Sequence, residues 1–154
     1  MPDLYSNTDD GWIRSDTGSP IGTWAGARDV TSGGTPDTND VRTSLAIASS
    51  RFGSRGGGNT FRVTRSFMWF DTSGITGTVS AATIKIRGFD QNSGSIIAVK
   101  STAFGADGGT ALAAGDIDAM PGWTTGASAA GNVTDYSSQI TSGWTVTGYN
   151  DLTG

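Results

Sequence analysis

The sequence contains no cysteine, no histidine and no glutamate, and lysine occurs only twice among its 154 residues. Without cysteine there is no disulfide and no thiolate metal site, and without histidine the commonest general base is missing. We therefore expect a chain that is not an enzyme and that uses no cofactor. Glutamate and lysine cover the exposed faces of most helices, so their scarcity also argues against long helices.

Small and β-branched polar residues are abundant instead. The 24 glycines, 22 threonines and 18 serines suit strand faces and tight turns, and glycine and threonine are poor helix formers. The acidic residues are all aspartate, and the net charge is −4. An acidic chain does not attract nucleic acid or an anionic membrane, and no apolar run reaches the length of a membrane span. We expect an all-β protein that binds neither.

The clearest pattern lies in residues 59–87. In its first part apolar and polar side chains alternate with the period of two that a half-buried strand requires. In its second part Ile84 and Ile86 alternate with polar neighbours. Between the two parts, residues 71–74 read Asp-Thr-Ser-Gly, a turn sequence, because aspartate accepts from nearby backbone N–H groups and glycine tolerates positive φ. This stretch predicts two strands joined by a corner.

Shorter elements are predicted on both sides of this stretch. We expect strands at residues 12–15, 41–48, 95–100, 133–140 and 144–149, a long polar loop at residues 16–40, a glycine-rich hairpin connection at residues 49–58 and one short helical turn near residues 110–120. Seven to nine short antiparallel strands indicate a jelly-roll-like β-sandwich. Residues 1–9 are expected to be an N-terminal arm, and residues 10–154 a single β-sandwich domain.

Carboxylates are the remaining groups that could carry chemistry. Paired aspartates can act as the acid and base of a glycoside hydrolase, but the close pairs here are expected to cap turns or face water. Calcium needs several oxygen ligands from a loop, and the candidates are Asp107, Asp116 and Asp118. No Asp-x-Asp-x-Asp-Gly run is present, and there is no glutamate to complete one. We therefore expect no metal site.

Aromatic residues offer a second kind of site. Trp69 is in phase with the apolar residues of its strand and is expected in the core. Trp123, Trp144 and Tyr149 lie near turns in the last third of the chain. They are candidates for an exposed platform that stacks on sugar rings or anchors a partner protein, with burial in the core as the alternative.

Three further residues are candidates for contact with a partner. Trp24 is one of two bulky apolar side chains in the long polar loop, and it could anchor that loop on its own domain or on a neighbour. Arg51 and Arg55 precede three consecutive glycines, and arginine suits bidentate contacts with carboxylates or phosphates. The alternative is a solvated hairpin connection.

Three runs of residues carry a resemblance to a known family. Residues 65–75 read Arg-Ser-Phe-Met-Trp-Phe-Asp-Thr-Ser-Gly-Ile, residues 81–86 read Ala-Ala-Thr-Ile-Lys-Ile, and residues 10–15 read Asp-Gly-Trp-Ile-Arg-Ser, with Trp24 and Arg28 after them. The first two runs resemble the central signature of the DNRLRE, or disaggregatase-related, β-sandwich domains, and the third resembles the first-strand motif of that family. Such domains are non-catalytic modules of carbohydrate-active and cell-surface proteins. Similar versions, with the Phe-Asp-Thr-Ser-Gly-Ile-Thr turn and a Thr-Asp-Tyr-Ser-Ser run like that at residues 134–138, occur in predicted structural proteins of tailed bacteriophages.

The resemblance also implies further strands after the region of Tyr149. Either these last strands lie outside this sequence, or a neighbouring subunit supplies them by strand addition.

Two functions follow as expectations. The first is a structural protein of a bacteriophage virion, assembled in the host cytoplasm, that acts as a head decoration protein, a fibre or a tail appendage. Its partners would be other virion proteins of the capsid or tail and copies of itself. The alternative is an extracellular or cell-surface carbohydrate-binding module of a polysaccharide-degrading system, whose ligand is a glycan such as one on a host surface.

Overall fold

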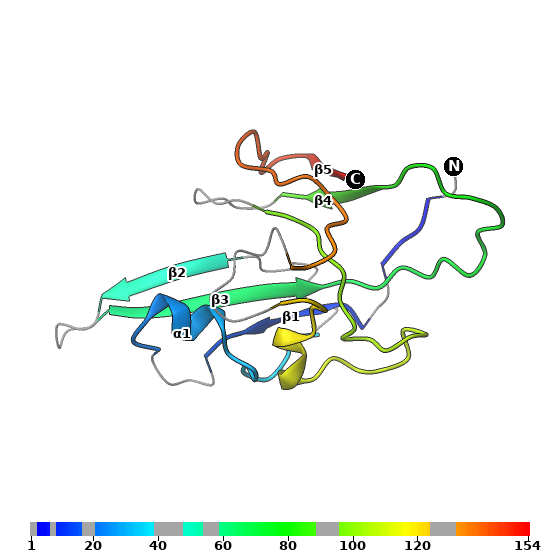
Figure 1. The fold of residues 1–154 in the computed structure, drawn as a ribbon. Coiled ribbons are helices and arrows are strands. Elements are labelled where there is room, and N and C mark those ends of the chain that lie inside the picture. The colour runs from blue at the N-terminus through cyan, green and yellow to red at the C-terminus, as the bar shows by residue number, and fades with distance from the viewer. Residues whose placement is uncertain are drawn as a thin grey trace.

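The computed structural model describes residues 3–6, 9–16, 21–38, 48–53, 59–88, 96–123 and 132–154, and for residues 48–53 it describes the backbone. This part of the chain forms five strands, one short α-helix and one 3₁₀ helix (Figure 1). Their order and bounds are β1 (Gly11–Arg14), α1 (Trp24–Arg28), β2 (Ala48–Gly53), β3 (Asn59–Phe67), β4 (Thr83–Arg87), the 3₁₀ helix η1 (Ala114–Asp118) and β5 (Tyr149–Thr153).

The strands form two antiparallel sheets. One has the order β1-β3-β2, with β3 in the middle, and the other consists of β4 and β5. Figure 1 shows the β4–β5 sheet lying above the longer β2–β3 ladder. Two antiparallel sheets with little helix confirm the all-β prediction, and η1 confirms the short helical turn near residues 110–120. The described residues hold five strands, fewer than the seven to nine expected.

The central stretch folds largely as its pattern predicts. Its two strands are β3 and β4, and the turn between them forms as expected. The Ser73 N–H donates to Asp71 Oδ1 at 2.9 Å, and the Ile75 N–H donates to the Thr72 carbonyl at 3.0 Å. Because β3 and β4 belong to different sheets, this corner carries the chain from one sheet to the other.

Four predictions need correction, one for a connection and three for strands. Residues 49–58 were expected to be a hairpin connection, but β2 spans Ala48–Gly53 and pairs along its length with β3. A neighbouring strand that offers a complete ladder outweighs the weak strand propensity of a Gly- and Ser-rich segment. The strands expected at 95–100 and 133–140 are replaced, within the described residues, by the single bridges Ile96↔Ile140 and Val99↔Asp135. The last strand was expected at residues 144–149, but β5 begins at Tyr149 and runs to Thr153. Of the strand expected at residues 41–48, residues 41–47 lie outside the described part.

The helix α1 interrupts the expected polar loop. The Thr23 side chain accepts a hydrogen bond from the Gly26 N–H at 3.1 Å and caps the helix start, and Arg28 lies in the last turn, where a positive charge is favourable. The helix packs on β3: the Trp24 and Phe61 rings meet edge to face, with centroids 5.8 Å apart, and Ala27 is buried. Burial of this face explains why so short a helix is stable.

The main hydrophobic core lies between the β1-β3-β2 sheet and the segments around η1. Ile13 of β1 and Ile117 of η1 are fully buried. Gly33 lies directly against both, and its N–H donates to the Ala114 carbonyl at 2.8 Å. The other buried members of this cluster are Phe67, Ala103, Phe104 and Leu112.

Candidate functional site

The face of the β4–β5 sheet that is exposed to solvent is the candidate functional site, and we call it the outer face. Along β4 the residues Thr83, Lys85 and Arg87 are exposed, and along β5 the same is true of Tyr149, Asp151 and Thr153. This follows from the period of two, since the residues between them point inward. The register pairs them across the sheet as Thr83↔Thr153, Lys85↔Asp151 and Arg87↔Tyr149.

The register puts one aromatic ring opposite one guanidinium. Tyr149 is 67% exposed, and it faces Arg87 across the ladder. Tyrosine and arginine are among the residues most enriched in the energetically dominant parts of protein interfaces, because each buries a large area and also forms hydrogen bonds. Tyr149 was a predicted site residue. Arg87 was not, because only the register shows that the two are paired.

An ion pair lies at the centre of the outer face. Lys85 Nζ is 3.0 Å from Asp151 Oδ1 and 3.1 Å from Oδ2. Both side chains are at least half exposed, so the pair adds at most about 1 kcal/mol to stability. With Lys85 and Arg87 against Asp151, the outer face is positive by one charge, although the chain as a whole has a charge of −4. The outer face therefore suits an acidic partner surface.

The inner side of the same sheet holds the outer face in place. Leu152 is buried, and so is Asn150. The Asn150 carboxamide accepts from the Thr145 N–H at 2.7 Å and donates to the Thr145 carbonyl at 2.9 Å and to the Ile86 carbonyl at 3.3 Å. A single buried amide thus joins β4, β5 and the preceding loop, and fixes the strand that presents Tyr149.

The three residues of the predicted aromatic platform lie in different surroundings. Trp144 is half-buried, and its indole nitrogen approaches Gly88 closely, at the end of β4 where the Gly88 N–H donates to the Gly148 carbonyl. Trp123 is also half-buried and lies against Arg65 of β3, whose guanidinium carbon is 4.8 Å from the ring centroid. Tyr149 alone of the three is strongly exposed.

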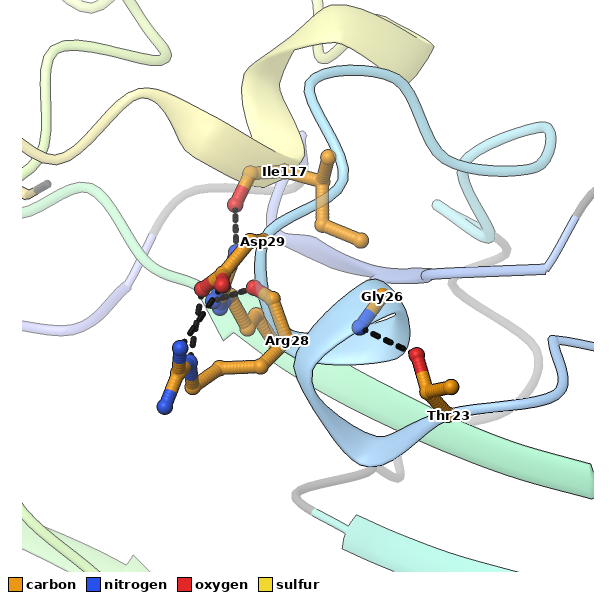
Figure 2. Close-up of polar contacts among 6 residues, drawn as sticks. Thr23, Gly26, Arg28, Asp29 and Ile117 are labelled. Carbon is orange, nitrogen blue, oxygen red and sulfur yellow. Dashed lines mark hydrogen bonds and ion pairs between the residues drawn. The ribbon is translucent and has the colours of Figure 1, made fainter. Parts of the chain in front are cut away.

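Arg65 is the centre of a polar cluster that joins β3, α1 and η1. Its guanidinium donates to the Ile117 carbonyl at 2.5 Å and to the Arg28 carbonyl at 2.7 Å. Burial lowers the pKa of Arg65, and the charges of Asp118 and Asp29 oppose that change. Figure 2 shows the neighbouring ion pair of Arg28 and Asp29, in which Arg28 Nε lies 2.6 Å from Asp29 Oδ1. Both of these hydrogen bonds from Arg65 go to backbone carbonyls of the chain itself, so the cluster is a structural clamp.

The remaining predicted contact residues are only partly placed. Trp24 is 43% exposed at the start of α1, with its ring against Phe61. The backbone of Arg51 lies in β2 opposite Phe61, while its side chain and all of Arg55 fall outside the described part.

The structure does not bring the calcium candidates together. Asp107 accepts from the Gly109 N–H at 3.1 Å, and Asp116 accepts from the Ala113 N–H at 2.7 Å, so each carboxylate stabilises its own turn. No group of three acidic side chains that could hold a metal ion occurs among the described residues. The negative charge of Asp118 instead favours the charged form of Arg65 and opposes the lowering of its pKa by burial.

No helix in the described ranges is both long and apolar enough to cross a membrane. Comparisons of the chain with protein-family models, with curated proteins and with solved structures find no match. The resemblance to the DNRLRE domains therefore stays a prediction.

Proposed function

We propose that this chain is a non-enzymatic structural protein of a bacteriophage virion: a head decoration protein, a fibre or a tail appendage. It acts by association with other virion proteins and with copies of itself, and its two sheets belong to a jelly-roll-like β-sandwich. The observation that carries the proposal is the outer face of the β4–β5 sheet, where exposed Tyr149 lies opposite Arg87. The resemblance of residues 65–86 to structural proteins of tailed phages supports the location in a virion.

The energetics of the outer face favour association. Covering the exposed two thirds of a tyrosine removes on the order of 100 Å² from water, which contributes about 3 kcal/mol. The excess positive charge beside it attracts an acidic surface, and each copy of this chain carries a net charge of −4. A contact made by each of many copies in a lattice gains further through avidity.

The first test is the mass of the purified chain in solution, measured by light scattering over a range of concentrations. A stable assembly, at a multiple of the 15.7 kDa chain mass, is expected. Tyr149→Ala should weaken that assembly about tenfold or more, whereas Tyr136→Ala should not, although Tyr136 is itself 52% exposed. A monomer at every concentration would reject self-association.

A second measurement tests the virion itself. The tryptic peptide of residues 66–85 should be found by mass spectrometry in particles purified from cultures that produce the chain. Its absence from purified particles, together with its presence in the soluble remainder, would reject the virion proposal.

Carbohydrate binding is the second candidate function, and the exposure of Tyr149 is what favours it. Trp144 lies in the loop before β5, so the two could form one edge of a sugar platform. Binding to a glycan that is lost in Tyr149→Ala, from a variant that stays folded and monomeric, would support this function over association.

A further inference from the structure

A hollow of about 700 Å³ lies where the chain leaves β3, and it shares no residue with the outer face. Three segments meet there: the N-terminal residues, the turn after β3 and the turn before residue 110. In Figure 1 the N-terminal segment, drawn blue, runs beside the green loop that follows β3. The residues that line the hollow are Tyr5, Trp69, Asp71, Thr72, Ser73, Ala106 and Asp107.

Tyr5 is held at the hollow although it is 86% exposed. The next residue, Ser6, forms an antiparallel bridge with Phe70, and its hydroxyl hydrogen-bonds to the Asp10 carboxylate. The backbone around Tyr5 is therefore tied to the chain at two points. An exposed aromatic ring on an anchored segment is available to a ligand at a low entropic cost.

Trp69 forms a more rigid part of the lining. Its backbone N–H donates to Asp10 Oδ1 at 2.8 Å, and its side chain packs against the main hydrophobic core. Gly108, at a φ of +75°, lies so close to the indole that a Cβ there would overlap the ring. The absence of a side chain at Gly108 thus lets the turn before residue 110 lie directly on Trp69.

Two carboxylates flank the aromatic rings, and each is oriented by its own turn. Asp71 Oδ1 accepts from the Ser73 N–H at 2.9 Å, and Asp107 Oδ1 accepts from the Gly109 N–H at 3.1 Å. The hydroxyl and the N–H of Ser73 lower the pKa of Asp71, so that this group is ionised at neutral pH. Ionised carboxylates accept hydrogen bonds and donate none.

We propose that this hollow binds a neutral saccharide, with a sugar ring against Tyr5 and Trp69 and its hydroxyl groups donating to Asp71 and Asp107. Aromatic rings stack on the apolar C–H faces of sugars, and adjacent hydroxyls are suitable donors to oriented carboxylates. The Thr72 hydroxyl adds a group that can donate as well as accept. The site does not depend on the association function, because none of its residues lies on the outer face.

The charges of the hollow decide between ligand classes. Two carboxylates repel anionic ligands such as nucleic acid, acidic peptides and uronic acid polymers. A basic peptide is the competing possibility, since a guanidinium prefers a carboxylate with both oxygens available. In Asp71 and Asp107 one oxygen already accepts from the backbone, so only the other oxygen is fully free, which suits single hydroxyl donors of a sugar better than a two-pronged guanidinium.

The test is a titration of the ¹⁵N-labelled full chain, followed by NMR. The probes are cellohexaose, chitohexaose, maltohexaose and mannohexaose, each to about 10 mM, because isolated sugar sites are weak. At least one probe should shift the amide signals of Ser73 and Gly109, which donate to the two carboxylates. Tyr5→Ala and Asp107→Asn should each raise the dissociation constant about fivefold or more.

Tyr149→Ala is the matched control, since it removes an exposed tyrosine of the outer face instead. It should leave the shifts at Ser73 and Gly109 unchanged if the hollow is the site. Shifts confined to the region of Tyr149 would overturn the proposal and support the other platform. The proposal would equally fail if no probe shifted any amide, or if only an arginine-rich peptide did so.

Discussion

Replacing Arg65 by alanine should cause a large loss of stability. The residue is half-buried, and its guanidinium bonds the carbonyls of Ile117 and Arg28 and lies over the Trp123 ring. Removing it leaves two acceptors that no longer have their donors, each at a cost of about 1–3 kcal/mol, and loses the contact with the ring. Relief of the desolvation of the charge offsets part of this. We expect a net loss of about 2–4 kcal/mol.

Urea unfolding followed by tryptophan fluorescence measures the effect. For a chain of this size the midpoint should fall by about 1–2 M. Arg65→Lys keeps the charge but cannot bond both carbonyls in a fixed fork, so it should fall between wild type and Arg65→Ala. Lys100→Ala, which removes an exposed cation, should stay within about 0.5 kcal/mol. If Arg65→Ala were as stable as Lys100→Ala, the interpretation of the cluster as a clamp would be wrong.

Two more predictions concern the core and the pH dependence of stability. Gly33→Ala places a methyl group against Ile13, 3.1 Å from the Ile117 side chain and 2.5 Å from a backbone carbonyl, and should cost about 1–3 kcal/mol in chemical unfolding. Gly115→Ala, where a Cβ meets nothing within 4 Å, is the control and should not destabilise; equal effects would refute the steric argument. Burial raises the pKa of Asp10 above 3.8, against hydrogen bonds from Trp69 and Ser6. Its contribution to stability is therefore full at a pH below 3.8 and is lost as the pH rises through the raised pKa. Asp10→Asn should remove this part of the pH profile of unfolding, and an unchanged profile would contradict the assignment.

The sequence predicts best where a local pattern and its environment agree. The alternation of Ile84 and Ile86 with polar neighbours is enough to predict β4, and the turn that starts at Asp71 is encoded by its own side-chain chemistry. The same is true of η1, which ends at Asp118, shortly before the proline and glycine at residues 121–122. In these cases the deciding interactions are between residues close in the sequence.

Prediction fails where the partner is distant in the sequence. Nothing within residues 48–53 favours a strand strongly, and β2 forms because β3 supplies a ladder of six pairs. The helix α1 does have a local signal, the capping residue Thr23 before two alanines, but five residues are too few for a helix to persist without β3 beneath it. Trp69 combines a local and a distant signal. Its phase with the apolar residues of β3 correctly predicts its contact with the core, but the hollow that it lines depends on Gly108, which lies far along the chain.

The candidate site illustrates the same limit at the level of single residues. Tyr149 can be singled out from the sequence as an aromatic residue near a turn, but its partner Arg87 lies 62 positions earlier, as the difference between the two paired numbers gives. Only the β4–β5 register makes them neighbours, and a slip by one residue would turn Tyr149 inward and expose Asn150 and Leu152. The buried carboxamide of Asn150 opposes that slip, because its hydrogen bond to the Ile86 carbonyl of β4 exists in one register only, while its two bonds to Thr145 hold it on the inner side. The identity of the outer face is therefore encoded less by the residues that form it than by the buried polar residue behind it.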